Sequence, residues 1–105
     1  MANKKFDALM KTLTKEKVAV IHAAFEGAPT TVAFVEVDKT LTDRMKMEAA
    51  FVKTNSINDA WWNNEGVTPM FGGETCRSTS VGDMVLIGTK KYKFVGTEEL
   101  VWEEV

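Results

Sequence analysis

Two runs of strand-forming residues near the start of the chain constrain its fold more than any other feature. The first is KVAVIHAAF, from Lys17 to Phe25, and the second is TVAFVEV, from Thr31 to Val37. β-Branched residues recur in both runs, and the intervening EGAPT supplies the Gly and Pro that mark a turn. The two runs therefore predict an antiparallel hairpin.

Helical spacing precedes and follows this hairpin. Asn3 can cap a first helix, and the apolar residues after it recur on one stripe at Phe6, Leu9, Met10 and Leu13. The segment KTLTDRMKMEAAFVKTN predicts a second helix, in which Thr40 or Thr42 is the cap and Asp43 lies in the first turn. Its residues at helical spacing are Leu41, Met45, Glu48 or Ala49, and Val52, and Met47 and Phe51 form an i,i+4 pair.

The C-terminal part of the chain is again strand-like. DMVLI and KYKFV, separated by a GTK turn, predict two strands, and ELVWEEV predicts a last one. A chain of 105 residues has the size of a single domain, 1–105. The order helix, hairpin, helix and three-stranded meander predicts the α+β class. We expect a small five-stranded antiparallel, barrel-like sheet with an N-terminal helix, and a second helix plus a long loop inserted between strands two and three.

The long loop, SINDAWWNNEGVTPMFGGE, contains two adjacent tryptophans. Neighbouring residues of an extended loop point in opposite directions, so one ring can cap the core while the other stays accessible. Accessible Trp61 or Trp62, flanked by Asn63, could stack on bases or hold a partner protein. The alternative is that both rings cover the open end of a small barrel.

The segment CRSTSVGD precedes the most strand-like part of the chain. Gly82 and Asp83 permit a tight turn, and the hydroxyl residues can satisfy backbone groups where the strand begins. Arg77 could pair with Asp83 or close against an aromatic face. The functional interpretation makes Arg77, Ser78 and Ser80 an anion-binding patch, since a guanidinium matches the geometry of a phosphate.

The sequence offers little for catalysis. Nucleophilic catalysis by Cys76 needs a base, and His22 is the only histidine, so a dyad requires the fold to bring these two residues together. One Cys and one His exclude ordinary structural zinc spacing, and no nucleotide-cradling glycine motif occurs. We therefore expect no metal, no cofactor and no enzymatic activity.

The charge distribution is uneven although the net charge is only −2. Lysines near the N-terminus could track phosphates, which defines an alternative nucleic-acid site at Lys4, Lys5, Lys11 and Lys15. The single cysteine suits a reducing compartment, and no signal peptide or apolar run of about 20 residues is present. These features predict a cytoplasmic protein that does not enter a membrane.

The stretch AFVKTNSINDAWWNNEGVTP…CRSTSVGDMVLIGTKKYKFVG resembles a group of small uncharacterised proteins of tailed phages, especially marine ones. The similarity spans about Glu48–Gly96, and RSTSVGD at Arg77–Asp83 is its most specific part. The sequence departs from the group after Gly96, where GTEELVW replaces an expected aromatic residue. The resemblance implies a viral origin and residence in the cytoplasm of a host, with no assigned reaction.

The N-terminal stretch FDALMKTLTKEKVAVIHAAFEG resembles in its layout the opening of Sm-like proteins, which form rings that bind RNA. The helix-containing insertion and the acidic C-terminus depart from that pattern. We expect a non-catalytic phage-type accessory module that binds a protein partner or itself as a homo-oligomer. The alternative is an Sm-like RNA-binding oligomer, and a cysteine-dependent enzyme comes third.

Overall fold

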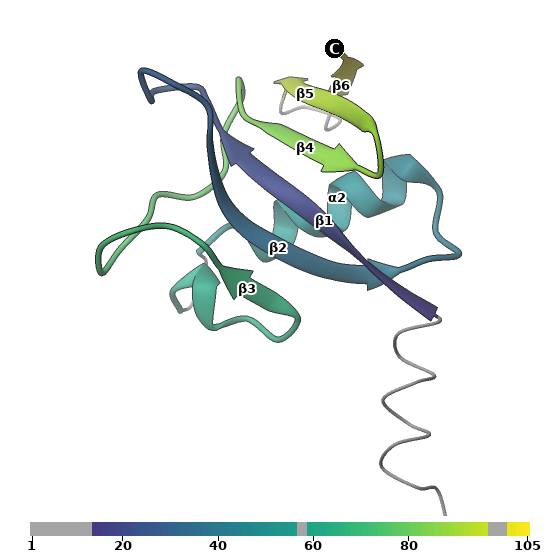
Figure 1. The fold of residues 1–105 in the computed structure, drawn as a ribbon, viewed down its shortest axis with the longest axis horizontal. Coiled ribbons are helices and arrows are strands. Elements are labelled where there is room, and N and C mark those ends of the chain that lie inside the picture. Colours follow the sequence, from purple (N-terminus) through teal and green to yellow (C-terminus); the bar gives the residue numbers. More distant parts are fainter. Residues whose placement is uncertain (1–13, 57–58, 97–100) are drawn as a thin grey trace, which may run out of the picture.

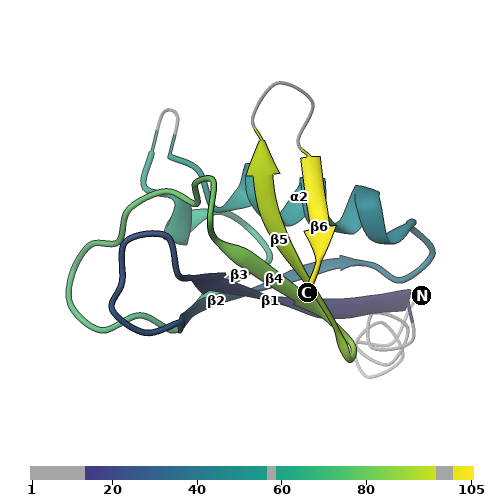
Figure 2. The same cartoon turned by 90° about the horizontal axis from the view of Figure 1, so that it is seen from above.

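The computed structural model describes residues 14–56, 59–96 and 101–105. In chain order its elements are β1 (Lys15–His22), β2 (Thr30–Asp38), α2 (Asp43–Lys53), the 3₁₀ turn η1 (Trp61–Asn63), β3 (Val67–Pro69), β4 (Met84–Ile87), β5 (Lys90–Gly96) and β6 (Val101–Glu104). The strands form one antiparallel sheet in the order β3-β2-β1-β4-β5-β6, and α2 packs on one face of it (Figures 1 and 2). The expected N-terminal helix falls on residues 1–13, outside these ranges.

The predicted hairpin of β1 and β2 is confirmed. Its register runs from Lys15 opposite Asp38 to His22 opposite Thr30, with an irregularity after Val20. Because strand side chains alternate between the two faces of a sheet, the even-numbered residues of β1 point toward α2 and the odd-numbered ones point away. This alternation places the last residue of β1, His22, on the same face as the buried core.

The expectation of a five-stranded barrel is wrong, because the sheet has six strands and is open. The additional strand is β3, which lies in the tryptophan loop and pairs with β2 through Phe34 opposite Thr68. A three-residue strand that ends in Pro69 carries a weak sequence signal, and proline is tolerated at a sheet edge.

Closure would require the two outer strands to meet. They lie instead at opposite ends of the strand order, because β3 takes the free edge of β2 while β6 pairs with β5. The Sm-like barrel expected from the N-terminal layout is therefore wrong as well. The described ranges also hold one α-helix and a 3₁₀ turn, where two helices were expected.

Helix α2 forms as the sequence predicts and closes the core from one side. Of the two possible caps, Thr42 is the one observed, with its Oγ1 accepting from the Met45 amide at 3.2 Å. Met47 and Ala50 turn inward. The core cluster that they complete contains Val18, Val20, Val32, Ala33, Val35, Val37, Trp61, Val85 and Ile87.

The apolar stripe that the sequence shows in α2 points mainly outward. Met45 and Val52 are 50% and 56% exposed. The helix therefore has an inner apolar face that is buried and an outer one that is not. No helix in the described ranges is long and apolar enough to span a bilayer.

Candidate functional site

Asp83 is the centre of a polar cluster between the end of β1 and the start of β4. Its carboxylate is fully buried. Oδ1 accepts from the amides of Ala23 and Ala24 at 2.8 and 3.0 Å and from Arg77 Nη2 at 2.7 Å. Oδ2 accepts from Arg77 Nη1 and the Ser80 amide, both at 2.7 Å. One carboxylate thus ties the loop after β1 to the loop before β4.

Gly82 allows these two loops to approach each other. Its φ is +99°, and a Cβ at this position would lie 2.9 Å from the Cβ of Ala24. The Asp83 amide donates to the Ser80 carbonyl at 3.0 Å, which closes a tight turn. The turn predicted at Gly82 and Asp83 is therefore confirmed.

Arg77 is held by two carboxylates and an aromatic ring. Besides the bidentate pair with Asp83, its Nε and Nη2 donate to Glu26 at 3.2 and 2.8 Å. Its guanidinium carbon lies 4.9 Å from the centroid of the Phe25 ring. Both predicted partners of Arg77, the acid and the aromatic face, are present. These contacts raise the pKa of Arg77, chiefly through the hydrogen bonds to Asp83.

The proposed anion-binding role of Arg77, Ser78 and Ser80 gains no support from these contacts. The carboxylates of Asp83 and Glu26 already neutralise the Arg77 guanidinium. Ser78 Oγ accepts from the Ser56 amide at 3.0 Å, and the Ser80 amide is bound to Asp83. A phosphate would have to displace a carboxylate, so this role stays a prediction.

His22 is buried at the inner end of the same cluster. Its Nε2 lies 3.1 Å from Thr79 Oγ1, which is 2.7 Å from Thr54 Oγ1. Thr54 in turn donates to the Ala50 carbonyl of α2 at 2.7 Å. Burial lowers the pKa of His22, against the opposing effect of Asp83. The chain of hydroxyls therefore connects a neutral imidazole to the end of the helix.

The fold does bring Cys76 and His22 together, with Cys76 Sγ 3.8 Å from His22 Nδ1. An activated dyad needs a thiolate beside an imidazolium. Burial instead raises the pKa of the Cys76 thiol and lowers that of His22, so both groups are held neutral. Cys76 and His22 are close together, but neither carries the charge that would make the cysteine nucleophilic.

We therefore expect Cys76 to react with iodoacetamide at pH 7 at least about tenfold more slowly in the folded protein than in urea, since the thiolate is the nucleophile. Mass spectrometry of timed samples measures the rate. The His22→Gln variant tests the dyad, because loss of a neutral neighbour should not slow alkylation. Fast alkylation that persists below pH 6 and disappears in His22→Gln would show an activated pair.

The two rings of the tryptophan loop differ in burial. Trp61 is fully buried, and its Nε1 lies 3.2 and 3.0 Å from the carbonyls of Cys76 and Arg77. Trp62 is half-buried and meets Trp61 edge to face, with the ring centroids 5.6 Å apart. Asn63 is exposed in η1. One ring caps the core, as the sequence suggested, and binding through Trp62 and Asn63 stays a prediction.

Of the lysines in the alternative nucleic-acid site, the structure describes only Lys15, which is exposed at the start of β1. Lys4, Lys5 and Lys11 lie outside the described residues. No group of three or more His, Cys, Asp or Glu that could hold a metal occurs within residues 14–56, 59–96 and 101–105.

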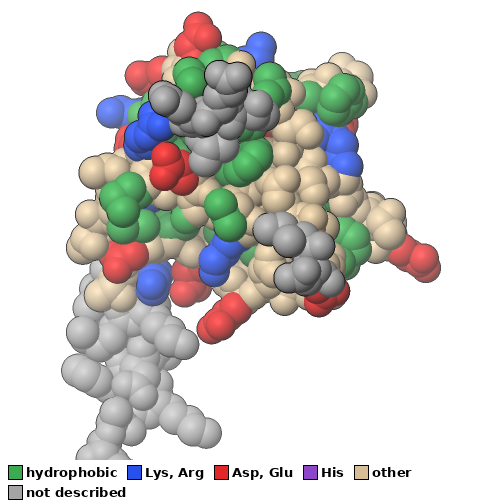
Figure 3. Space-filling model, turned by 180° about the vertical axis from the view of Figure 1, so that it is seen from behind, with side chains coloured by type: hydrophobic (Ala, Val, Ile, Leu, Met, Phe, Trp, Pro, Cys, Tyr) green, Lys and Arg blue, Asp and Glu red, His purple; other side chains and the backbone are tan. Residues whose placement is uncertain are grey.

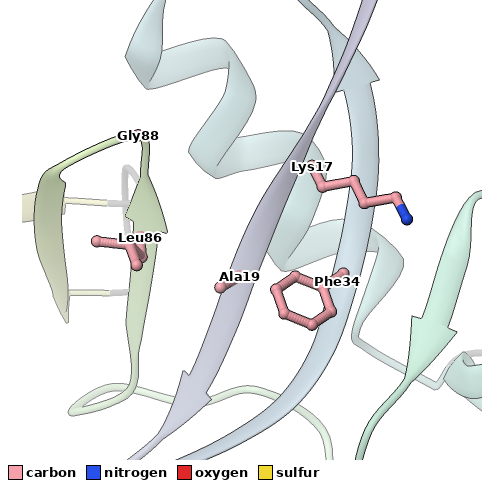
Figure 4. A pocket seen from close by; sticks show the side chains of 5 residues that line it. All are labelled: Lys17, Ala19, Phe34, Leu86 and Gly88. Carbon is pink, nitrogen blue, oxygen red and sulfur yellow. The ribbon is translucent and has the colours of Figure 1, made fainter. Parts of the chain in front are cut away.

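Two shallow apolar hollows were not anticipated from the sequence. The helix groove, of about 430 Å³, lies on the outer side of α2 and is lined by Leu41, Met45, Glu48, Ala49, Val52 and Lys53. The sheet groove, of about 390 Å³, lies on the opposite face of the sheet and is lined by Lys17, Ala19, Phe34, Leu86 and Gly88 (Figure 4). Seen from behind, hydrophobic side chains are exposed in patches between charged ones (Figure 3).

The helical spacing of residues 41–52 is the sequence signal that could have indicated the helix groove, because a second apolar stripe on one helix needs a second surface to cover it.

In comparisons with known proteins, no family model, no curated protein and no solved structure matches this chain.

Proposed function

We propose that this protein is a non-catalytic protein-binding module whose helix groove accepts an amphipathic helix of a partner. The observation that carries the proposal is the outward apolar stripe of α2. Met45, Ala49 and Val52 recur along about two turns of one face of α2, and Leu41, just before the helix, extends the same apolar lining. Such a face is the surface that helix-in-groove recognition uses.

The chemistry of the groove suits this kind of partner. Met45 is half exposed, and its unbranched side chain adapts to different apolar surfaces. Charged residues flank the stripe, with Arg44 and Glu48 forming an exposed ion pair at 3.2 Å. An apolar centre with a charged rim is typical of a specific interface.

The polar cluster supports the non-catalytic part of the proposal. Its carboxylate and guanidinium are engaged with each other, and its thiol and imidazole are neutral. The resemblance of Glu48–Gly96 to tailed-phage proteins adds the proposal that the partner is met in the cytoplasm of an infected bacterium. In a homo-oligomer, the helix groove of one chain would bind a second copy of the same chain.

The test compares two exposed methionines. We expect Met45→Asp to weaken partner binding by at least about tenfold, since a buried methionine side chain contributes about this much to affinity. Met70→Asp is the matched control, because Met70 is 52% exposed and lies outside the groove. An aspartate at position 45 suits the first turn of α2, so the variant should stay folded.

Affinity capture from phage-infected cells, followed by titration of the recovered protein, measures the effect. Sedimentation of the isolated protein at increasing concentration tests self-association in the same variants. If wild type and Met45→Asp bind the same partners equally well and sediment alike, the helix groove is not the binding surface.

A further inference from the structure

The outer face of the sheet, which points away from α2, is apolar at its centre. Ala19 of β1 pairs with Phe34 of β2 on one side and with Leu86 of β4 on the other, and residues directly opposite in a ladder point to the same face. Ile21 pairs with Met84 in the next outward-facing row. These five residues form the outer patch, an apolar area that spans three neighbouring strands.

The two central strands have the composition of strands that are covered on both sides. Residues 18–21 of β1 and Met84–Ile87 of β4 are continuous apolar runs. Antiparallel strands with one solvated face normally alternate apolar and polar residues, whereas continuous apolar runs belong to strands buried on two faces. The helix of the described ranges, α2, packs on the opposite face (Figure 2), and Phe34 and Leu86 are only half-buried. The outer patch therefore retains apolar area that a partner can bury.

The charged residues beside the outer patch differ in sign between its two sides. On β2, Glu36 follows Phe34 at the next outward-facing position and lies opposite Lys17 of β1. On β5, Lys91 lies opposite Leu86 and therefore also points outward. Both Glu36 and Lys91 are exposed. The patch thus has an acid on its β2 side and a lysine on its β5 side.

We propose that the outer patch binds the same patch of a second copy of this chain, with the two sheets face to face. The two-fold axis runs along the strands, between β1 and β4, so β1 of one copy lies over β4 of the other. Leu86 of each copy then meets the sheet groove of the other above Ala19 (Figure 4). The same axis places β2 over β5, which brings Glu36 of one copy toward Lys91 of the other. The face is therefore complementary to itself in shape and in charge, as a two-fold interface requires.

The dimensions of the sheet suit a weak dimer. Six strands about 4.8 Å apart cross about 24 Å, and the eight residues of β1 extend about 27 Å. Each copy thus offers a face of about 600 Å², at the lower limit of what each partner buries in a stable interface. We therefore expect a dimer that dissociates on dilution. This inference goes beyond the proposed function, because the helix groove lies on the other face and stays available to its own partner.

Sedimentation equilibrium of the full chain at increasing concentration tests the proposal. Wild type should associate to a dimer, and Leu86→Asp should raise the dissociation constant at least about tenfold, because it places a charge at the apolar centre of the interface. Met45→Asp, in the helix groove, is the control and should dimerise as wild type does. A wild type that stays monomeric at every concentration, or a dimer that Met45→Asp abolishes and Leu86→Asp preserves, would overturn the proposal.

Charge reversal tests the arrangement of the two copies without changing the apolar patch. Because Glu36 and Lys91 are exposed, Glu36→Lys and Lys91→Glu should both stay folded, which circular dichroism checks. Each single variant should weaken dimerisation about threefold or more, because like charges then face each other across the interface. The double variant restores opposite charges and should recover the wild-type dissociation constant. A double variant that dimerises no better than the single variants would rule out this face-to-face arrangement.

Discussion

Asp83→Ala is expected to destabilise the protein by about 3–5 kcal/mol, because it removes a fully buried carboxylate and leaves its hydrogen-bond donors without their acceptor. The substitution leaves the amides of Ala23, Ala24 and Ser80 without their acceptor. It also leaves the Arg77 guanidinium with only Glu26 to neutralise it. Urea unfolding followed by circular dichroism measures the loss.

Glu26→Ala is the matched control for this prediction. Glu26 binds the same guanidinium, but its side chain is 30% exposed, so its removal should change the free energy of unfolding by less than about 1 kcal/mol. A similar loss in both variants would mean that the charge of Arg77, and not the burial of Asp83, determines the stability of this region.

The dependence of the free energy of unfolding on pH, below about pH 4, tests the same interactions of Asp83. Burial would raise the pKa of Asp83, but hydrogen bonds from Arg77 and from the amides of Ala24, Ser80 and Ala23 outweigh it and hold the pKa at about 2. A depressed carboxyl pKa stabilises the protein above the unfolded value near 4. This contribution, about 2 kcal/mol, disappears as the pH falls from about 4 to 2.

His22 adds a separate loss at higher pH. Because its folded pKa lies below 6.5, the unfolded chain takes up the proton first, and stability falls as the pH drops below 6.5.

The Asp83→Ala variant should lack the loss of stability that wild type shows between pH 4 and 2. An unchanged loss in this variant would assign it to other carboxylates.

The second large effect is expected at Trp61. Trp61→Ala should cost about 3–5 kcal/mol, since it empties a fully buried site and removes the donor for the carbonyls of Cys76 and Arg77. Trp61→Phe fills most of the space but lacks the donor, so we expect an intermediate loss of about 1–2 kcal/mol. Denaturation followed by circular dichroism avoids the change in intrinsic fluorescence.

Trp62→Ala serves as the comparison, because this ring is only half-buried beside Trp61 and Phe71. Its loss should be no more than about 2 kcal/mol. If Trp61→Ala were no less stable than Trp62→Ala, the loop would not be the cap of the core that the contacts indicate.

Local patterns in the sequence predicted the local structure. β-Branched residues predicted the hairpin of β1 and β2, and Thr40 or Thr42 with Asp43 predicted the start of α2, where Thr42 is the observed cap. Pairing with Asp83 was one of the two contacts expected of Arg77, and the observed ion pair joins residues six positions apart. In each case the groups that interact are near in sequence, so that little chain entropy opposes their meeting.

The order of the strands was decided only by tertiary structure. All strand edges present the same amide and carbonyl groups, so no local pattern states that β3 pairs with β2 or that the sheet stays open. The 3.8 Å contact between Cys76 and His22 has the same origin, because 54 positions separate them and the fold alone joins them. Periodicity reveals that an apolar face exists, but which face the core covers depends on how the sheet and helix pack, as the outward stripe of α2 shows.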